Sequence, residues 1–498
     1  MRQPQTTATR VAEPSPRISG QVANRLRTGD RTGHEWYRFV LSFPPHLVRD
    51  CLEKFAIVAG QRVLDPFCGT GTTLVECKKA GLASVGLEAN PMAHFASTVK
   101  TTWDKQGGEL LTSARRIADA ASRELEAQGY GDDSYGPLFD GAKSCAGRAK
   151  APLQSLDDQQ TSLLLGSSIS PLPLHKTLVL LGEINRSAPP RLASYCHLAL
   201  ARALVESVGN LHFGPEVGVG APKADVGVVR EWFNRLADIA RDLDELRPRR
   251  DISCRVLRAD ARNVAHELPP ESIDAVITSP PYPNEKDYTR TTRLESVILG
   301  FIKNKAELRE FKRTLVRSNT RNVYRDDNDH GWVELHPEIQ RLAARIEQRR
   351  IELNKTSGFE RMYARVTRLY FGGMARHLAG LRSVLRPGAR LAYVVGDQAS
   401  YLRVLIKTGE ILARIAESLG YRVTGIDLFR TRLATATRAQ LREEVLLLQW
   451  PGAGKSLGQA RERRSQILRL TRNAPQTSEC CFSLPAQVQP QTTFSVCR

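Results

Sequence analysis

The segment Asp65-Pro66-Phe67-Cys68-Gly69-Thr70-Gly71-Thr72-Thr73 joins a short apolar run to a helical pattern. A strand that ends at Asp65 and turns through Gly69 and Gly71 into a helix leaves backbone N–H groups beside a ligand, and glycine lets that ligand approach the main chain. Glu88 ends the next apolar run about twenty residues later, where a carboxylate can accept both hydroxyl protons of a ribose. Together they predict a nucleotide-cofactor site, although a glycine-rich turn by itself also occurs as a purely structural turn.

A second segment, Thr278-Ser279-Pro280-Pro281-Tyr282, follows another apolar run. The exocyclic amino nitrogen of a nucleobase is a poor nucleophile because its lone pair is delocalised into the ring. The Ser279 hydroxyl and the Pro280 carbonyl can accept its two N–H bonds, while the prolines restrict φ, so the lone pair is aimed at an electrophile. Tyr282 can stack on a base taken out of a duplex. The alternative is a Pro-Pro turn that caps a buried strand, with Tyr282 packed in the core.

Both segments, in this order, resemble the amino-methyltransferases that use S-adenosylmethionine to modify DNA bases. The first segment, followed by Gly86-Leu87-Glu88-Ala89-Asn90-Pro91, resembles the cofactor motif of that family. The stretch from Phe39 to Val48 resembles the family segment that lies over the methionine end of the cofactor. We call Ser279-Pro280-Pro281-Tyr282 the clamp, because it would hold the amino group of the base. In the family, a serine at the first position of the clamp is typical of N4-cytosine enzymes, whereas aspartate is usual in N6-adenine enzymes.

The resemblance implies S-adenosylmethionine as cofactor, no metal, and catalytic roles for Ser279, Pro280, Pro281 and Tyr282. It implies cofactor contacts for Phe43, Pro44, Asp65, Pro66, Phe67, Gly69, Gly71, Thr72, Glu88, Asn90 and Asp260. Asp260 sits where the family places an acid near the adenine amino group, although an aspartate after a strand is common. The polar run from Pro283 to Tyr288 either shapes the base pocket or forms an exposed loop.

Alternating apolar runs and helical patterns predict the elements that position these residues. Val63-Leu64 and Val85-Gly86-Leu87, with a helical pattern between them, predict a β-α-β unit with parallel strands. Further strands are expected at 252–257, 273–278, 390–395, 423–429 and 444–448, and the last pair is expected to form an antiparallel end of the sheet. Helices are expected at 93–125, broken at Gly107-Gly108, and at 192–208, 228–246 and 411–419, with another that ends at Leu385.

The resemblance implies an α/β fold of the class I Rossmann-like methyltransferase type, with a mostly parallel seven-stranded sheet, helices on both faces and two insertions. We expect a flexible basic arm at 1–30 and a disordered tail at 451–498. Between them, the methyltransferase domain is expected in three parts: the cofactor-binding half at 31–103, the catalytic part at 250–302 and the remainder at 362–450. The first insertion, 104–249, is expected to be mainly helical with a disordered loop between about 129 and 175, and the second, 303–361, is basic and a candidate for DNA contact.

Composition favours a polyanionic partner, because 72 Lys and Arg against 53 Asp and Glu give a formal net charge of +19. The nine cysteines form no C-x-x-C pair, as expected for a reduced cytoplasmic protein without a zinc site. No apolar run has the roughly 18 residues of a membrane span. The resemblance implies double-stranded DNA as the polyanionic partner and admits a cognate restriction endonuclease as another, and the oligomeric state stays open.

The motifs discriminate among several possible functions. Cytosine-C5 methylation needs a nucleophilic thiolate, typically from a Pro-Cys pair, and the sequence contains none. Related RNA enzymes, such as tRNA guanine-N2 methyltransferases, usually carry Asp at the first clamp position and an N-terminal RNA-binding domain, for which the 35 or so residues before the globular part leave no room. A non-catalytic methyltransferase-like protein would not need intact motifs. Site-specific N4-cytosine methylation of double-stranded DNA is the prediction, and N6-adenine methylation is the alternative.

Overall fold

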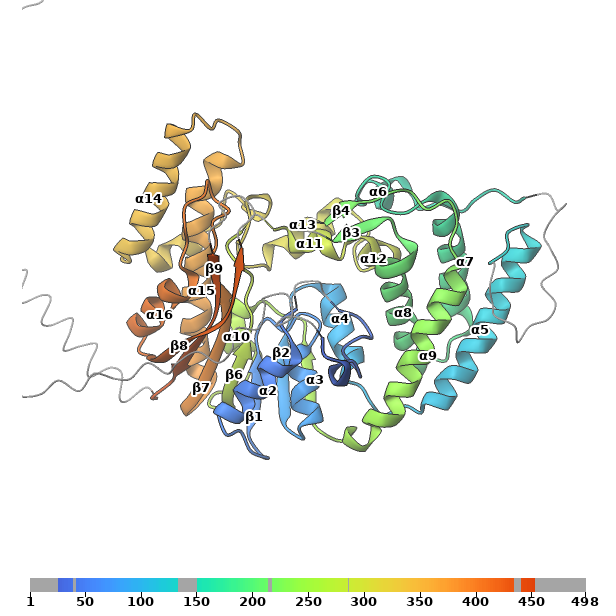
Figure 1. The fold of residues 1–498 in the computed structure, drawn as a ribbon, viewed down its shortest axis with the longest axis horizontal. Helices are drawn as coiled ribbons and strands as arrows, with labels where there is room; N and C mark the ends of the chain where they lie inside the picture. Colours follow the sequence, from blue (N-terminus) through green and yellow to red (C-terminus); the bar gives the residue numbers. More distant parts are fainter. Residues whose placement is uncertain are drawn as a thin grey trace, which may run out of the picture. The chain divides into compact units, whose positions relative to one another are not determined.

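Seven strands form one mixed sheet in the order β5-β2-β1-β6-β7-β9-β8 (Figure 1). The strands are β1 (Arg62–Asp65), β2 (Ala83–Leu87), β5 (Cys254–Leu257), β6 (Ile273–Thr278), β7 (Leu385–Gly396), β8 (Arg422–Leu433) and β9 (Gln440–Gln449). The structure is a computed structural model that describes residues 26–38, 42–132, 150–213, 217–284, 286–433 and 440–452. These residues belong to one compact unit, Met1–Ala453.

Strands β5, β2, β1, β6 and β7 pair in parallel, whereas β9 runs antiparallel to both β7 and β8. The parallel β-α-β unit and the antiparallel end of the sheet are thus confirmed. Because the carboxyl ends of parallel strands share one edge, the loops after Asp65, Leu87 and Thr278 lie together there.

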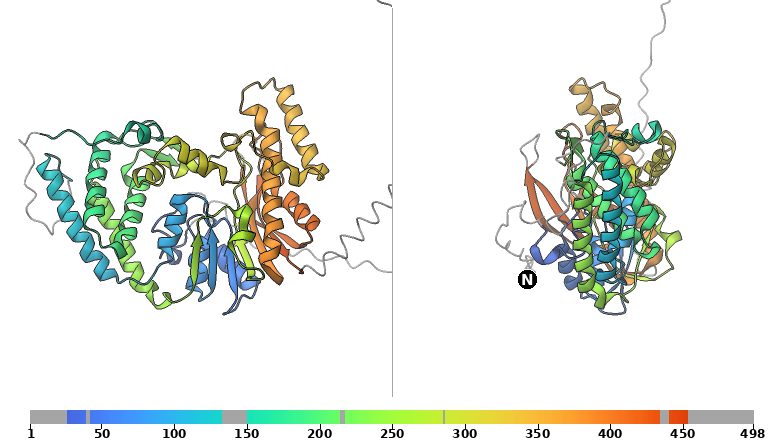
Figure 2. Two further views of the ribbon diagram at one scale, coloured as in Figure 1. Left: turned by 180° about the vertical axis from the view of Figure 1, so that it is seen from behind. Right: turned by 90° about the vertical axis from the view of Figure 1, so that its right-hand side faces the viewer.

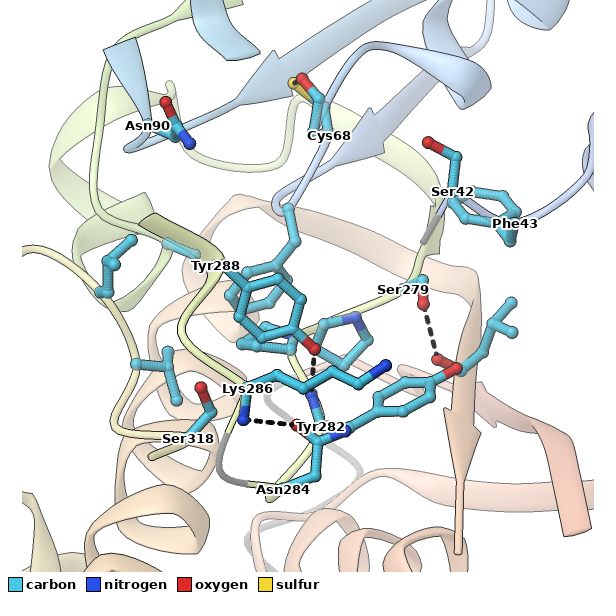
Figure 3. A pocket seen from close by; sticks show the side chains of 18 of the residues that line it. Ser42, Phe43, Cys68, Asn90, Ser279, Tyr282, Asn284, Lys286, Tyr288 and Ser318 are labelled. Carbon is cyan, nitrogen blue, oxygen red and sulfur yellow. Dashed lines mark hydrogen bonds between the residues drawn. The ribbon is translucent and has the colours of Figure 1, made fainter. Parts of the chain in front are cut away.

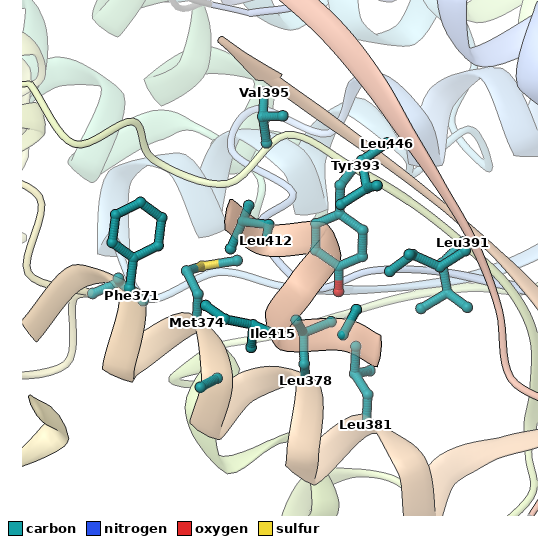
Figure 4. Close-up of a cluster of buried hydrophobic side chains, with 14 of the residues drawn as sticks. Phe371, Met374, Leu378, Leu381, Leu391, Tyr393, Val395, Leu412, Ile415 and Leu446 are labelled. Atoms are coloured by element: carbon teal, nitrogen blue, oxygen red, sulfur yellow. The ribbon is translucent and has the colours of Figure 1, made fainter. Parts of the chain in front are cut away.

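Alternate residues of the strands face two different cores, as the two-residue period of a strand requires. Val276, Tyr393 and Leu446 face helices α15 (Tyr363–Val384) and α16 (Thr408–Ser418), in the cluster that Figure 4 shows. The neighbouring Ile277 and Val394 face α2 (Pro45–Lys54) and α3 (Thr72–Lys79) on the other side of the sheet. Helices therefore cover both faces, as predicted.

The insertion between β2 and β5 is built mainly from helices α5 (Gly107–Ala127), α7 (Pro171–Ser187), α8 (Pro190–Ala203) and α9 (Val228–Leu246). These helices lie side by side at one end of the sheet (Figures 1 and 2) and share a core with α4 (Pro91–Lys100).

Two features of this insertion differ from the sequence prediction. Helix α7 begins inside the predicted loop because Pro171 and Pro173 occupy its first turn, where proline is tolerated but resembles a loop signal in sequence. A short hairpin of β3 (Leu211–Phe213) and β4 (Val217–Val219) was not predicted. Residues 133–149 of the predicted loop lie outside the described residues.

The segment 303–361 contains helices α13 (Lys305–Arg313) and α14 (Pro337–Glu352) and short 3-10 turns, among them η5 (Thr320–Asn322), η6 (Asp329–Val333) and η7 (Glu360–Met362). Val316, Val333 and Ile339 are buried in the same core as α15. The segment is therefore integrated into the core around α15, and only part of its surface is available to a partner.

Residues 28–30, which were predicted to belong to a flexible arm, are structured. Thr28–Asp30 form the 3-10 turn η1, and the buried Asp30 carboxylate accepts a hydrogen bond from Arg49 at 2.7 Å. Residues 1–25 and all but the first two residues of the predicted tail lie outside the described residues. Within the described part of the chain, no helix is long and apolar enough to cross a membrane.

Candidate active site

Asp65 connects the ends of the two strands that carry the sequence motifs. Its carboxylate Oδ1 accepts the hydroxyl hydrogen of Thr278 at 2.6 Å and the N–H of Phe67 at 3.1 Å. The side chain is fully buried, and burial raises the pKa of this carboxyl to about 6. Asp65 does not line the pocket, so the structure places this predicted cofactor ligand behind the site, where it fixes the clamp strand against the glycine loop.

The two loop positions 69 and 71 need glycine for different physical reasons. Gly69 has φ +50° and lines the pocket, where its N–H donates to Glu88 at 2.7 Å. Gly71 has φ +84° and faces α4, because a Cβ at this position would lie 2.9 Å from Cβ of Ser97. The sequence analysis assigned Gly71 to close approach of the cofactor. Contact with α4 is the constraint in the structure.

Glu88 presents a carboxylate to the pocket from the end of β2. Its Oε2 accepts the N–H of Gly69 and its Oε1 accepts the N–H of Asn90, each at 2.7 Å. Burial is the largest cause that raises the pKa of Glu88, to about 7, and the nearby Asp65 carboxylate adds to it. Each oxygen keeps a lone pair for a further donor, as two ribose hydroxyls would require.

Asn90 lines the same pocket, but its side chain is engaged by the protein. Its Oδ1 caps helix α4 by accepting from the N–H of Met92 at 3.0 Å, and its Nδ2 donates to the hydroxyl of Thr292 at 3.1 Å. Pro91 occupies the first helical position after this cap. The Asn-Pro pair thus fixes where α4 begins, beside the carboxylate of Glu88.

Asp260 also lines the pocket and is held by an arginine. Both of its carboxylate oxygens accept hydrogen bonds from Arg262, the shortest at 2.7 Å, and Arg262 also contacts Asp329 at 2.7 Å. Its contact with an adenine amino group stays a prediction. Pro44 is the buried N-cap of α2 and does not line the pocket, whereas Phe43 does. Phe39, Val40 and Leu41 lie outside the described residues.

The clamp begins where β6 ends and faces β7. The Ser279 hydroxyl donates its hydrogen to the carbonyl of Val394 at 3.1 Å (Figure 3), so its lone pairs are available to a donor in the pocket. Pro280, Pro281 and Tyr282 line the pocket with it. The N–H of Tyr282 donates to the hydroxyl of Tyr288 at 3.3 Å, which joins the clamp to the polar run that follows it.

One pocket of about 720 Å³ contains both motifs. The sequence-predicted residues that line it are Phe43, Pro66, Phe67, Gly69, Thr72, Glu88, Asn90, Asp260, Ser279, Pro280, Pro281 and Tyr282. Segments separated by about two hundred residues thus meet in one cavity, close to the size expected for a small-molecule site. The cofactor region and the clamp region line the same pocket, and transfer of a group between two bound molecules requires that both bind side by side.

Comparisons with known proteins agree with this geometry. The N6/N4 methyltransferase family model, described as DNA methylase, matches residues 15–97, which include the glycine loop and Glu88. The Type II methyltransferase M.BsoBI from Geobacillus stearothermophilus is 24% identical over 474 residues, covering 89% of this chain and 90% of that protein. These comparisons support a DNA amino-methyltransferase of the N4/N6 family.

Two further comparisons accompany these. The Type II methyltransferase M.AvaI from Nostoc sp. is 22% identical over 423 residues, covering 83% of this chain and 84% of that protein. The crystal structure of TrmN from Thermus thermophilus aligns with 12% identity and a TM-score of 0.26, covering 82% of this chain and 48% of that one.

The cofactor of this methyltransferase is S-adenosylmethionine, and the residues of the loop fit it. Glu88 offers two acceptor oxygens at the end of β2. The hydroxyl oxygen of Thr70 is buried in the pocket wall and has no hydrogen-bond partner among the described residues, so a polar ligand would satisfy it. Phe43 and Phe67 add apolar surface to the same wall.

Sequence reasoning left the role of one group of pocket residues open and missed a second group. Asn284, Lys286 and Tyr288 line it, so the polar run after the clamp shapes the pocket rather than forming a detached loop. Arg430, Arg432 and Glu443 reach it from β8 and β9. No motif marked these last three, because they enter the site through strand pairing and not through a loop next to the clamp.

The predicted basic surface at 303–325 needs correction at two positions, Arg317 and Lys312. Arg317 has a side chain that is only 3% exposed, and its guanidinium pairs with Asp327 at 2.7 Å. Lys312 pairs with Asp287 and is also mostly covered. The exposed basic residues of that segment are Lys303, Lys305, Arg309, Arg313, Arg321 and Arg325. A charge that already has a buried carboxylate partner is not available to phosphate.

Proposed function

We propose that this enzyme transfers a methyl group from S-adenosylmethionine to the N4 nitrogen of cytosine at specific sites in double-stranded DNA. The observation that carries the proposal is the hydrogen bond from Ser279 to the Val394 carbonyl. It leaves a neutral oxygen, beside the Tyr282 hydroxyl, that can accept a hydrogen bond from an amino group in the pocket. A serine there is typical of the N4-cytosine enzymes that the chain resembles.

Two acceptors would hold the target nitrogen. One N–H of the amino group would donate to Ser279 Oγ and the other to the Pro280 carbonyl, since both residues line the pocket. Acceptors on both N–H bonds favour a pyramidal nitrogen, whose lone pair no longer lies in the ring π system. The two prolines fix the main chain, so this arrangement costs little reorganisation when the base enters.

The bound cofactor supplies a methyl group activated by a positively charged sulfur. Glu88 would hold the ribose hydroxyls, and Phe67 and Gly69 would form the pocket wall beside them. The N–CH₃ bond would form as the S–CH₃ bond breaks, and the nitrogen would then carry one hydrogen more than the product. That proton is acidic on a cationic nitrogen and leaves to water, so the transfer needs no dedicated base.

The decisive experiment is mass spectrometry of nucleosides from the DNA of cells that express the protein. We expect 4-methylcytosine in cells with the wild type and none above the vector background in cells with Ser279→Ala. Appearance of 6-methyladenine in its place would overturn the choice of base while keeping the DNA enzyme. Methylated nucleosides found only in RNA would overturn DNA as the substrate.

A further inference from the structure

Two arginines of β8 share one buried carboxylate in the pocket wall. Arg430 and Arg432 are two residues apart on the strand, so their side chains lie on the same face. Glu443, opposite Arg430 on β9, contacts Arg430 Nε at 2.5 Å and Arg432 Nε at 3.4 Å. Two guanidinium groups thus contact the single carboxylate of Glu443, a residue that is only 8% exposed.

This group lies next to the clamp. Gly396 of β7 pairs with Glu443, and a Cβ built on Gly396 would meet Glu443 Cγ at 3.1 Å and Tyr282 Cε2 at 3.2 Å. The Tyr282 ring and the stem of Glu443 therefore pack on the same glycine. Burial raises the pKa of the Tyr282 hydroxyl, and the Glu443 carboxylate adds to that rise while Arg432 opposes it, in agreement with their proximity.

The charge balance of this group favours an anionic ligand. Glu443 can neutralise one of the two guanidinium groups, so the group of three keeps a net positive charge. Arg432 also donates from Nη2 to the Asp397 carbonyl at 2.7 Å, which orients its guanidinium. Its Nε is buried and makes no hydrogen bond within the described residues, since its contact with Glu443 at 3.4 Å is an ion pair only. An oriented guanidinium with a remaining donor suits the oxygens of a phosphate group.

We propose that Arg430 and Arg432, held by Glu443, form a binding site for the phosphodiester group next to the target nucleotide. The inference rests on the proposed function, since a base in the clamp brings its own backbone phosphates to the pocket. Strand order supports DNA over the cofactor as the source of the anion. The cofactor loop follows β1 and β2, whereas β8 is the opposite edge strand of the sheet.

The chain offers a matched control close by. Arg442 contacts Glu444 at 2.5 Å in the same Nε-to-carboxylate manner, is half-exposed, and does not line the pocket. Replacing Arg442 by Gln removes the same charge from the same pair of strands. A loss of DNA affinity that comes only from the lower net charge therefore appears in Arg442→Gln as well as in Arg432→Gln. A loss that comes from the proposed site appears in Arg432→Gln alone.

The test measures binding of the full chain to a fluorescein-labelled duplex that contains a cytosine methylated by the wild type. For Arg432→Gln we expect Kd to rise about tenfold and the log-log salt slope to fall by about one unit. Arg432→Lys keeps the charge, so the slope should stay while part of the affinity is lost. Arg442→Gln should match the wild type, and calorimetry should give every variant the wild-type affinity for S-adenosylmethionine.

Three outcomes separate the possible failures. If Arg432→Gln and Arg430→Gln bind the duplex with wild-type affinity and slope, no phosphate lies on this site. If cofactor affinity falls while DNA affinity stays, the anion is the cofactor carboxylate and the inference is overturned. If the wild type neither binds nor methylates DNA, the proposed function itself fails.

Discussion

Ser279 and Glu88 determine the chemistry of the two halves of the pocket, and each does so as a hydrogen-bond acceptor. Ser279 has its hydrogen committed to Val394, so its oxygen accepts. Each carboxylate oxygen of Glu88 accepts one main-chain N–H, so the second lone pair of each oxygen is available to the ligand. Both assignments lead to predictions for single substitutions.

Ser279→Ala should lose turnover and keep cofactor binding. The hydroxyl grips the target nitrogen and belongs to β6, whereas the cofactor loop belongs to β1. We expect kcat to fall about 100-fold or more, as for loss of one oriented polar group in an active site. Calorimetry should show an unchanged Kd for S-adenosylmethionine. Ser400→Ala, another pocket serine, is the control, and wild-type-like turnover of Ser279→Ala would remove the clamp assignment.

Cofactor affinity should depend on pH through Glu88. Burial raises the pKa of this carboxyl to about 7, so the group is protonated in much of the free enzyme at lower pH. The ionised form offers the better acceptors for ribose hydroxyls, and binding must therefore favour it. We expect Kd to rise as pH falls from about 8 to about 6 and to be constant above that range. Calorimetry across this interval measures it.

Glu88→Gln is the control for the pH profile because its amide does not titrate. It should bind S-adenosylmethionine weakly and without pH dependence. The neighbouring Asp65 has a pKa that burial raises to about 6. A profile that survives unchanged in Glu88→Gln would therefore assign the titration to Asp65 and contradict the role of Glu88.

At the scale of elements, strand β7 and the segment before α14 position the pocket walls. Strand β7 carries Val394 for the clamp and Gly396 for the contact of Tyr282 with Glu443. The segment between α13 and α14 holds its shape through Arg317, whose guanidinium also donates to the carbonyls of Lys312 and Arg313. Ser318, the next residue, lines the pocket.

Arg317→Ala should therefore destabilise the protein. Removing one partner of a buried ion pair leaves Asp327 without its counter-charge, which costs about 3–5 kcal/mol in comparable sites. The free energy of unfolding from denaturant titration measures the loss. Arg313→Ala is the matched control, because Arg313 pairs with Asp326 on the open surface and should change stability little. Equal stability of the two variants would contradict this role for Arg317.

At the scale of the whole molecule, the formal charge of +19 makes DNA attraction sensitive to salt. The structure divides the basic residues of 303–325 into paired, covered ones and exposed ones. DNA contact by the exposed set stays a proposal. It implies that the triple variant of Lys305, Arg321 and Arg325 to Ala flattens the log-log salt slope of duplex binding by about two to three units.

The control for this prediction is a second triple, Arg241, Arg249 and Arg250 to Ala, which removes the same charge from the helical insertion. All three of its residues are exposed. Fluorescence titration at several salt concentrations gives the slope for both variants. A slope that changes only in the second triple would place the DNA on the helical insertion between β2 and β5.

Local signals determined much of this protein. Chain-adjacent residues form the glycine loop and the clamp, and the continuous apolar runs 392–395 and 445–448 already mark strands that are buried on both faces. Each strand of the sheet was found because a strand and its neighbouring turn are encoded by consecutive residues. The ends of the helices and strands were predicted less accurately. Helix α7 is an example, because proline in a first helical turn and proline in a loop look alike in sequence.

Tertiary structure alone decided which residues share the pocket. Arg430 and Glu443 face each other through the register of two antiparallel strands, and Ser279 meets Val394 across β6 and β7. Gly71 is required by Ser97 of another helix, and Arg317 is withdrawn from the surface by Asp327. Composition counts every charge equally, whereas packing determines which charges reach solvent. Contacts between residues distant in sequence depend on the relative placement of whole elements, which no short stretch of sequence specifies.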